Sequence, residues 1–126
     1  MEKRILVVED DENNLYVTTH ILEKTRYQIL TANNGKDALE VAKKQRPDLI
    51  LLDVALPDVD GYEVAEHLRT LQDFHQTPII ALTAYSMPGD REKMMKSGFT
   101  DYIPKPVVPR DLVKKVEQYL AIQAEK

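Results

Sequence analysis

Acidic, hydroxyl and amino side chains come directly after short apolar runs of this sequence, and together they have the chemistry to handle a phosphoryl group. They are Glu9, Asp10, Asp53, Thr83 and Lys105. Carboxylate oxygens are ligands that suit Mg²⁺, and an aspartate can act as the nucleophile that forms an acyl phosphate. A hydroxyl and an ammonium can neutralise the oxygens of the transferred group. These residue types favour metal-assisted phosphoryl transfer onto Asp53.

The elements that must position these residues are predicted by the hydrophobic pattern, in which short apolar runs alternate with helix-spaced stripes. The pattern gives five strand–helix units. The first, third and fourth runs are almost wholly aliphatic, as is typical of strands buried on both faces of a parallel sheet. We therefore expect an α/β fold with a doubly wound parallel sheet of five strands and five helices. The expected strands are residues 5–8, 27–32, 49–52, 79–82 and 102–104, with the last two helices after Pro88 and Pro109.

The sheet would bring the acidic side chains together. Ligand sites in open parallel sheets form beyond the carboxyl ends of the strands. If the strand order is that of five-stranded doubly wound folds, the first and third strands are neighbours, and Glu9, Asp10 and Asp53 converge. Converging carboxylates either raise a pKa or recruit a cation, so we infer a Mg²⁺ site that a phosphate completes. The alternative role for an acid after a strand is a helix cap, and Asp11 or Asn13 could be that cap.

Length and composition limit what else the protein could be. Its 126 residues allow one domain, 1–126, with a short polar tail from about residue 122. The net charge of −4 disfavours binding to nucleic acid or anionic membranes, and the lack of cysteine excludes disulfides and thiolate chemistry. No apolar run approaches the ~20 residues of a membrane span, and no signal peptide is evident, so we expect a cytoplasmic location.

Five motifs, in order, resemble the receiver domain of two-component response regulators, the CheY-like family. They are LVVED at 6–10, LLDV at 51–54, LPDVDG at 56–61, ALTA at 81–84 and YIPKP at 102–106, and the resemblance covers about the whole chain. It implies a flavodoxin-like sheet of order 2-1-3-4-5. It also implies phosphorylation of Asp53, with Mg²⁺, by a histidine kinase, a hybrid kinase or a phosphotransfer protein. Such a domain catalyses its own phosphorylation and dephosphorylation but turns over no separate substrate.

The resemblance assigns the metal ligands. Glu9, Asp10, Asp53 and the backbone carbonyl of Ala55 would surround the Mg²⁺ ion. Glu9 stands where the family often has Asp, and this longer side chain still reaches a metal through water. Ala55 and Tyr85 lie two residues beyond Asp53 and Thr83, at positions that tune the lifetime of the acyl phosphate in this family. Ala55 would leave the site open to water and Tyr85 could shield it, so the net lifetime stays open.

The resemblance also implies a switch. Lys105 would bind the phosphoryl group, and the peptide bond from Lys105 to Pro106 is expected to be cis. The Thr83 hydroxyl would move onto a phosphoryl oxygen, and the Tyr102 ring would follow into the space that it leaves. The face that changes is the fourth helix, fifth strand and fifth helix, which would bind a downstream protein target. Since one domain uses up the chain, output would pass through another protein; the domain is expected to be a monomer, with dimerisation on phosphorylation left open.

Three other functions compete with this one. A nucleotide- or flavin-binding domain of the same fold would need a phosphate-cradling loop after the first strand, but that loop is Glu9-Asp10-Asp11-Glu12 and repels phosphate unless a metal intervenes. A phosphohydrolase with an aspartyl phosphate needs a second acid two residues after its nucleophile, and this position is Ala55. The third alternative is a receiver that only docks, which the complete set of acidic, hydroxyl and lysine residues argues against.

Other residues have structural interpretations. Asp58 and Asp60 lie between Pro57 and the third helix, where they are best explained as turn and cap residues. At least one of Met94 and Met95 is expected to pack in the core.

Overall fold

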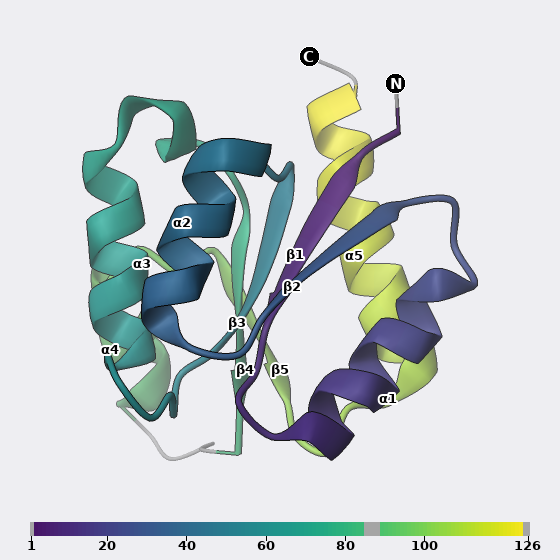
Figure 1. The fold of residues 1–126 in the computed structure, drawn as a ribbon, viewed down its shortest axis with the longest axis horizontal. Helices are drawn as coiled ribbons and strands as arrows, with labels where there is room; N and C mark the ends of the chain where they lie inside the picture. Colours follow the sequence, from purple (N-terminus) through teal and green to yellow (C-terminus); the bar gives the residue numbers. More distant parts are fainter. Residues whose placement is uncertain (1, 85–88, 125–126) are drawn as a thin grey trace.

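Five parallel strands form the middle layer of the structure, in the order β2-β1-β3-β4-β5, and helices cover both faces (Figure 1). The structure is a computed structural model, and it describes residues 2–84 and 89–124. The helices α2, α3 and α4 lie on one face of the sheet, and α1 and α5 lie on the other (Figure 1). The strands are β1 (Arg4–Val8), β2 (Gln28–Ala32), β3 (Leu49–Asp53), β4 (Ile79–Thr83) and β5 (Asp101–Pro104). The helices are α1 (Glu12–Glu23), α2 (Gly35–Gln45), α3 (Gly61–Thr70), α4 (Asp90–Lys96) and α5 (Pro109–Ala124), with one 3₁₀ turn at Gln72–Phe74. The predicted fold class and strand order are confirmed.

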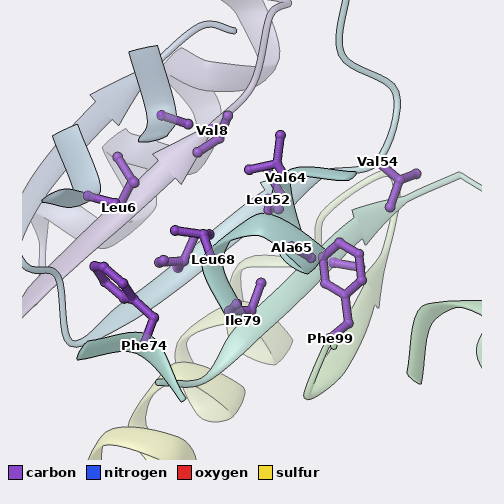
Figure 2. Packing of buried hydrophobic residues seen from close by; sticks show 14 of the residues in the cluster. Leu6, Val8, Leu52, Val54, Val64, Ala65, Leu68, Phe74, Ile79 and Phe99 are labelled. Atoms are coloured by element: carbon purple, nitrogen blue, oxygen red, sulfur yellow. The ribbon is translucent and has the colours of Figure 1, made fainter. Parts of the chain in front are cut away.

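The alternation of side chains along the central strands divides the core into two clusters. Leu6 and Leu52 point toward α2, α3 and α4, where Figure 2 shows them with Leu68, Phe74 and Phe99. The intervening strand residues point toward α1 and α5 and pack against Leu22, Leu112 and Val116, among others. Both faces of β1, β3 and β4 are therefore buried, which explains why these strands are continuous aliphatic runs.

The strands differ from their predicted bounds mainly by one residue at an end. β2 begins at Gln28, and not at Tyr27, because Gln28 is the first residue paired with β1. β3 and β4 each continue one residue further than predicted, because Asp53 pairs with Leu82 and Thr83 pairs with Pro104. The polar residues at these two ends therefore belong to the sheet and not to the loops after it.

Side chains cap three helices at their amino ends. Asp11 accepts a hydrogen bond from the Asn14 N–H at 2.9 Å, which confirms it as the cap of α1. Asp60 accepts from the Tyr62 N–H at 2.9 Å, which confirms it as the cap of α3. Asn34 caps α2. Each cap satisfies a backbone N–H that has no partner within its helix.

The carboxyl end of α4 explains the positive φ of Gly98 and the different burial of Met94 and Met95. Gly98 adopts a positive φ of 103°, and the Phe99 N–H donates back to the Met94 carbonyl at 3.1 Å, as in a Schellman motif. Met94 is buried beside Phe99 in the core, whereas Met95 is 52% exposed. The prediction that at least one of these methionines packs in the core is confirmed. The predicted start of this helix after Pro88 lies outside the described residues, and α4 is described from Asp90.

The guanidinium of Arg69 ties together the amino ends of β4 and β5. It donates to the carbonyls of Gly98 (2.8 Å), Phe74 (2.6 Å) and Thr77 (2.7 Å), and to the hydroxyl of Thr100 (3.2 Å). Thr77 and Thr100 each lie just before a strand, and Arg69 itself lies in α3. One half-buried side chain thus joins three segments at the end of the sheet opposite the carboxyl ends of the strands.

The fifth helix begins with Pro109 in its first turn, as predicted, because this position needs no backbone donor. It runs through Ala124, so the first residues of the polar tail expected from about residue 122 continue the helix. In the part of the chain that the structure describes, no helix combines the length and apolar character that crossing a membrane requires.

Candidate functional site

The carboxyl ends of β1, β3, β4 and β5 bring four of the predicted site residues to one edge of the sheet. Glu9 follows β1, Asp53 ends β3, Thr83 ends β4 and Lys105 follows β5. Glu9, Asp53 and Thr83 are almost fully buried. Since each of them lies at or next to a paired strand, the sheet and not a flexible loop determines where its side chain starts.

Lys105 joins the two buried acids. Its Nζ atom lies 2.7 Å from Oε1 of Glu9 and 3.0 Å from Oδ2 of Asp53. The lysine side chain is only 20% exposed, so these contacts are screened little by solvent. The three residues, which are far apart in the sequence, form one ion cluster.

Asp10 extends this cluster toward solvent. Glu9, Asp10 and Asp53 each offer a carboxylate oxygen, and these oxygens lie within 4.8 Å of one another. Asp10 is exposed, whereas Oε2 of Glu9 is buried and has no hydrogen-bond partner among the described residues. A buried carboxylate oxygen without a donor is costly unless a cation or proton is nearby. The three carboxylates offer only hard oxygen ligands, and they therefore fit a Mg²⁺ ion.

The electrostatics of the cluster raise two pKa values. Burial raises the pKa of Glu9 to about 7, the neighbouring Asp53 raises it as well, and Lys105 opposes this shift. Burial lowers the pKa of Lys105, but its hydrogen bonds to Glu9 and Asp53 outweigh this effect, so that the pKa lies above its usual value. Lys105 thus stays charged at neutral pH, and the acid pair retains affinity for one more positive charge.

The loop after β3 lies against the aspartate that it follows. The Ala55 N–H donates to Oδ1 of Asp53 at 3.0 Å, and the Gly61 N–H donates to the Val54 carbonyl at 3.1 Å. A Cβ atom at Gly61 would lie 2.4 Å from the Asp53 carbonyl oxygen and 2.6 Å from Cα of Val54, so only glycine fits here. The sequence signal for this close approach was the glycine that ends LPDVDG. The metal-ligand role expected for the Ala55 carbonyl stays a prediction.

The predicted switch residues lie on β4 and β5. Lys105 donates its backbone N–H to the Thr83 carbonyl at 2.9 Å, and the Lys105–Pro106 peptide bond is cis, as the resemblance implied. Tyr102 is half-buried and pairs with Ala81 in the strand register. The exchange of Thr83 and Tyr102 between two positions stays a prediction. Tyr85, which was expected to affect the lifetime of the acyl phosphate, lies outside the described residues.

A second polar cluster joins Tyr102 to α5, and sequence reasoning did not find it. Asp101 accepts from the Tyr119 hydroxyl at 2.7 Å and lies 3.2 Å from Nζ of Lys115. Lys115 also donates to the Tyr102 carbonyl at 3.0 Å. The only signal in the sequence was the spacing of Lys115 and Tyr119, which places both side chains on one face of a helix.

The five-stranded sheet of order 2-1-3-4-5 is the fold of solved CheY-like receiver domains. A model of the response regulator receiver domain matches residues 5–117, and the chain belongs to this family.

Relatives and solved structures agree with this membership. The chain is 39% identical over 121 residues to the polar-differentiation response regulator DivK of Brucella anthropi. The aligned residues cover 95% of this chain and 98% of the relative. A CheY-like response regulator receiver domain protein from Methanospirillum hungatei is 33% identical with a TM-score of 0.91, over 99% of this chain and 98% of that one. The receiver domain of the sensor histidine kinase PA1611 from Pseudomonas aeruginosa, with a magnesium ion coordinated in its active site cleft, is 34% identical with a TM-score of 0.88, over 96% and 99%.

The function of the family follows for this chain at the same level. It is a phosphorylation-dependent signalling domain of two-component systems. Receiver domains interact with histidine kinases and with downstream targets.

Proposed function

We propose that Asp53 is the phosphoryl acceptor and that Glu9, Asp10, Asp53 and the Ala55 carbonyl hold the Mg²⁺ ion that its phosphorylation needs. The observation that carries this proposal is the convergence of three carboxylates within 4.8 Å, with Lys105 bridging the two buried ones. The buried, unpartnered Oε2 of Glu9 supports a cation at this position. Bound there, Mg²⁺ would supply positive charge to offset that of the phosphoryl oxygens.

The chain's own residues account for the transfer. A carboxylate oxygen of Asp53 attacks the phosphorus of a phosphohistidine; the new O–P bond forms as the N–P bond breaks, and the released imidazole takes up a proton. The Ala55 N–H holds Oδ1 of Asp53 and so orients the carboxylate. The Lys105 ammonium follows the charge onto the phosphoryl group. The donor is a histidine kinase, a hybrid kinase or a phosphotransfer protein.

The same residues would catalyse dephosphorylation. Water attacks the phosphorus of the acyl phosphate, the bond to the Asp53 oxygen breaks, and inorganic phosphate leaves. Ala55 is exposed and small, so its side chain does not cover this approach. The domain therefore turns over only its own phosphoryl group and no separate substrate. Small acyl phosphates can serve as donors because the acceptor site is complete within one chain.

The signal would pass to a downstream protein target through α4, β5 and α5. The Thr83 hydroxyl binds a phosphoryl oxygen and the half-buried Tyr102 ring moves inward behind it. Shifting such an equilibrium from 1:99 to 99:1 takes about 5.5 kcal/mol, which a few charge-assisted contacts can supply. A cytoplasmic location and a monomer before phosphorylation belong to this proposal, and cell fractionation and sedimentation with and without phosphorylation test them.

Intact-mass analysis with acetyl phosphate and Mg²⁺ tests the acceptor. We expect the wild-type protein to gain the mass of one phosphoryl group and Asp53→Asn to gain none. Asp60→Asn is the matched control, because asparagine caps a helix about as well as aspartate and the position lies in the same loop. Unchanged labelling of Asp53→Asn would refute the acceptor, and labelling that persists in EDTA would refute the metal.

A further inference from the structure

The loop of residues 54–60 joins β3, which ends in Asp53, to α3, and it is held at both of its ends. At its start the Ala55 N–H donates to Asp53, and at its end the Gly61 N–H returns to the Val54 carbonyl. The loop therefore closes on itself beside the acceptor. Its middle is not restrained by these two hydrogen bonds.

Asp58, in the middle of this loop, binds a different element. Its Oδ1 accepts from the Gly35 N–H at 2.8 Å, and its Oδ2 accepts from the Lys36 N–H at 3.0 Å. Both donors belong to the first turn of α2, more than twenty residues earlier in the chain. The prediction that Asp58 is a residue of the turn before α3 missed this partner. The pKa of Asp58 lies below its usual value, chiefly because of these two backbone hydrogen bonds.

Capping of α2 alone does not require this arrangement. Asn34 already caps the helix from a neighbouring position, through a 2.8 Å hydrogen bond from the Asp37 N–H. The approach of the loop is also close, because a Cβ atom at Gly35 would lie only 3.0 Å from Cβ of Val59. A local cap restrains only its own helix, whereas the hydrogen bonds of Asp58 restrain the loop as much as the helix.

We propose that Asp58 is a positioning residue, which fixes the loop after β3 on α2 so that Ala55 is held at the acceptor. This inference rests on the proposed function of the site. Ala55 lies three residues before Asp58, in a loop that is also held by the hydrogen bonds at Asp53 and Val54 and by packing of Leu56 and Val59 against the core. Without the hydrogen bonds to α2, the loop samples conformations in which the Ala55 N–H leaves Oδ1 of Asp53. Only the remaining fraction binds metal and accepts phosphate productively.

The test compares Asp58→Ala with Asn34→Ala, which removes a capping hydrogen bond from the same helix end and no described hydrogen bond of the loop. Both variants should lose stability in urea. We expect Asp58→Ala to weaken Mg²⁺ binding by roughly fivefold, as measured by NMR titration. It should also slow labelling by acetyl phosphate by at least about the same factor. Asn34→Ala should keep both quantities within about twofold of wild type. Asp58→Asn retains one acceptor oxygen, and it should give intermediate values.

Amide hydrogen exchange in metal-free protein gives a readout that is independent of activity. The Ala55 amide should exchange faster in Asp58→Ala than in wild type, because this variant releases the loop. In Asn34→Ala the exchange rate of this amide should equal that of wild type. If Asp58→Ala does not fold, Asp58→Asn takes its place in every comparison.

The outcomes separate the inference from the function on which it rests. Wild-type protein that neither binds Mg²⁺ nor becomes labelled would overturn both. Wild-type protein that does both, with Asp58 variants that match Asn34→Ala in Mg²⁺ affinity, labelling rate and Ala55 exchange, would overturn the positioning role alone and leave Asp58 as a helix cap.

Discussion

Nζ of Lys105 lies 2.7 Å from Oε1 of Glu9, closer than the 3.0 Å that separates it from Oδ2 of Asp53. The lysine thus binds a buried acid of the proposed metal site as well as the proposed acceptor. It reduces the repulsion between these acids before any phosphate arrives, and it competes with a metal for the same negative charge.

Replacing Lys105 should therefore separate metal binding from phosphorylation. In Lys105→Ala we expect Mg²⁺ to bind roughly fivefold more tightly at low salt, because about 1 kcal/mol of cation repulsion is removed. Labelling by acetyl phosphate should become at least about tenfold slower, because a charged hydrogen bond to the phosphoryl group is lost. Calorimetric titration and intact-mass kinetics measure the two effects. The exposed Lys114→Ala is the control, and weaker Mg²⁺ binding in Lys105→Ala would contradict the competition.

Metal removal should reveal the cost of burying Glu9. Burial raises its pKa from the usual 4.5 to about 7 in the folded protein, so the folded state binds more protons than the unfolded state between these pH values. In EDTA the free energy of unfolding should fall as the pH rises from about 4.5 to about 7. Glu9→Gln cannot lose this proton, so it should be more stable than wild type at pH 8 by about 1–3 kcal/mol.

Added Mg²⁺ should reverse that order. The proposed Mg²⁺ site exists only in the folded protein, so Mg²⁺ should stabilise wild type at pH 8 and leave Glu9→Gln little changed. Urea unfolding at two pH values, with EDTA and with Mg²⁺, measures all of these terms. A pH-independent difference between the two proteins in EDTA would show that Glu9 titrates normally.

The contact between Tyr119 and Asp101 should be visible in an alkaline titration. Burial raises the pKa of the Tyr119 hydroxyl to about 12, and its hydrogen bond to the Asp101 carboxylate adds to this shift. The stability that this bond contributes is present below the unfolded pKa of about 10 and is lost as the pH rises through about 12. Ultraviolet absorbance should therefore show a late tyrosine step near pH 12. Asp101→Asn should move that step to lower pH and Tyr119→Phe should remove it, whereas Tyr16→Phe, at an exposed position, should leave it in place.

The core cluster between the sheet and helices α1 and α5 should lose stability when the packing of α5 is reduced. Leu112 is fully buried against the sheet, whereas Val108, just before the same helix, is 50% exposed. Leu112→Ala should lower the free energy of unfolding by about 2–5 kcal/mol, and Val108→Ala should change it by less than about 0.5 kcal/mol. Urea denaturation of the two variants compares these costs directly. Equal losses would mean that α5 does not pack as the structure describes.

The hydrophobic pattern predicted most of the fold because burial on both faces leaves a continuous aliphatic run, as in residues 49–52. It could not predict that Asp53 and Thr83 complete their strands, because pairing at a strand end depends on the neighbouring strand and not on local composition. Sequence position predicted Glu9, Asp53 and Lys105 as site residues, but the Lys105–Glu9 contact depends on two side-chain conformations. The link from Asp58 to α2 was missed for a similar reason, since it joins a loop to the start of a helix that only the folded sheet brings near it.

Arg69 holds the amino ends of β4 and β5 to α3. Its guanidinium donates hydrogen bonds to four oxygen atoms near the starts of β4 and β5. Displacing any of these oxygen atoms would leave a half-buried cation with fewer hydrogen bonds. The starts of these strands thus form a fixed base. If Asp53 is phosphorylated as proposed, we therefore expect the accompanying movement of β4 and β5 to be largest at their carboxyl ends, which lie beside Asp53.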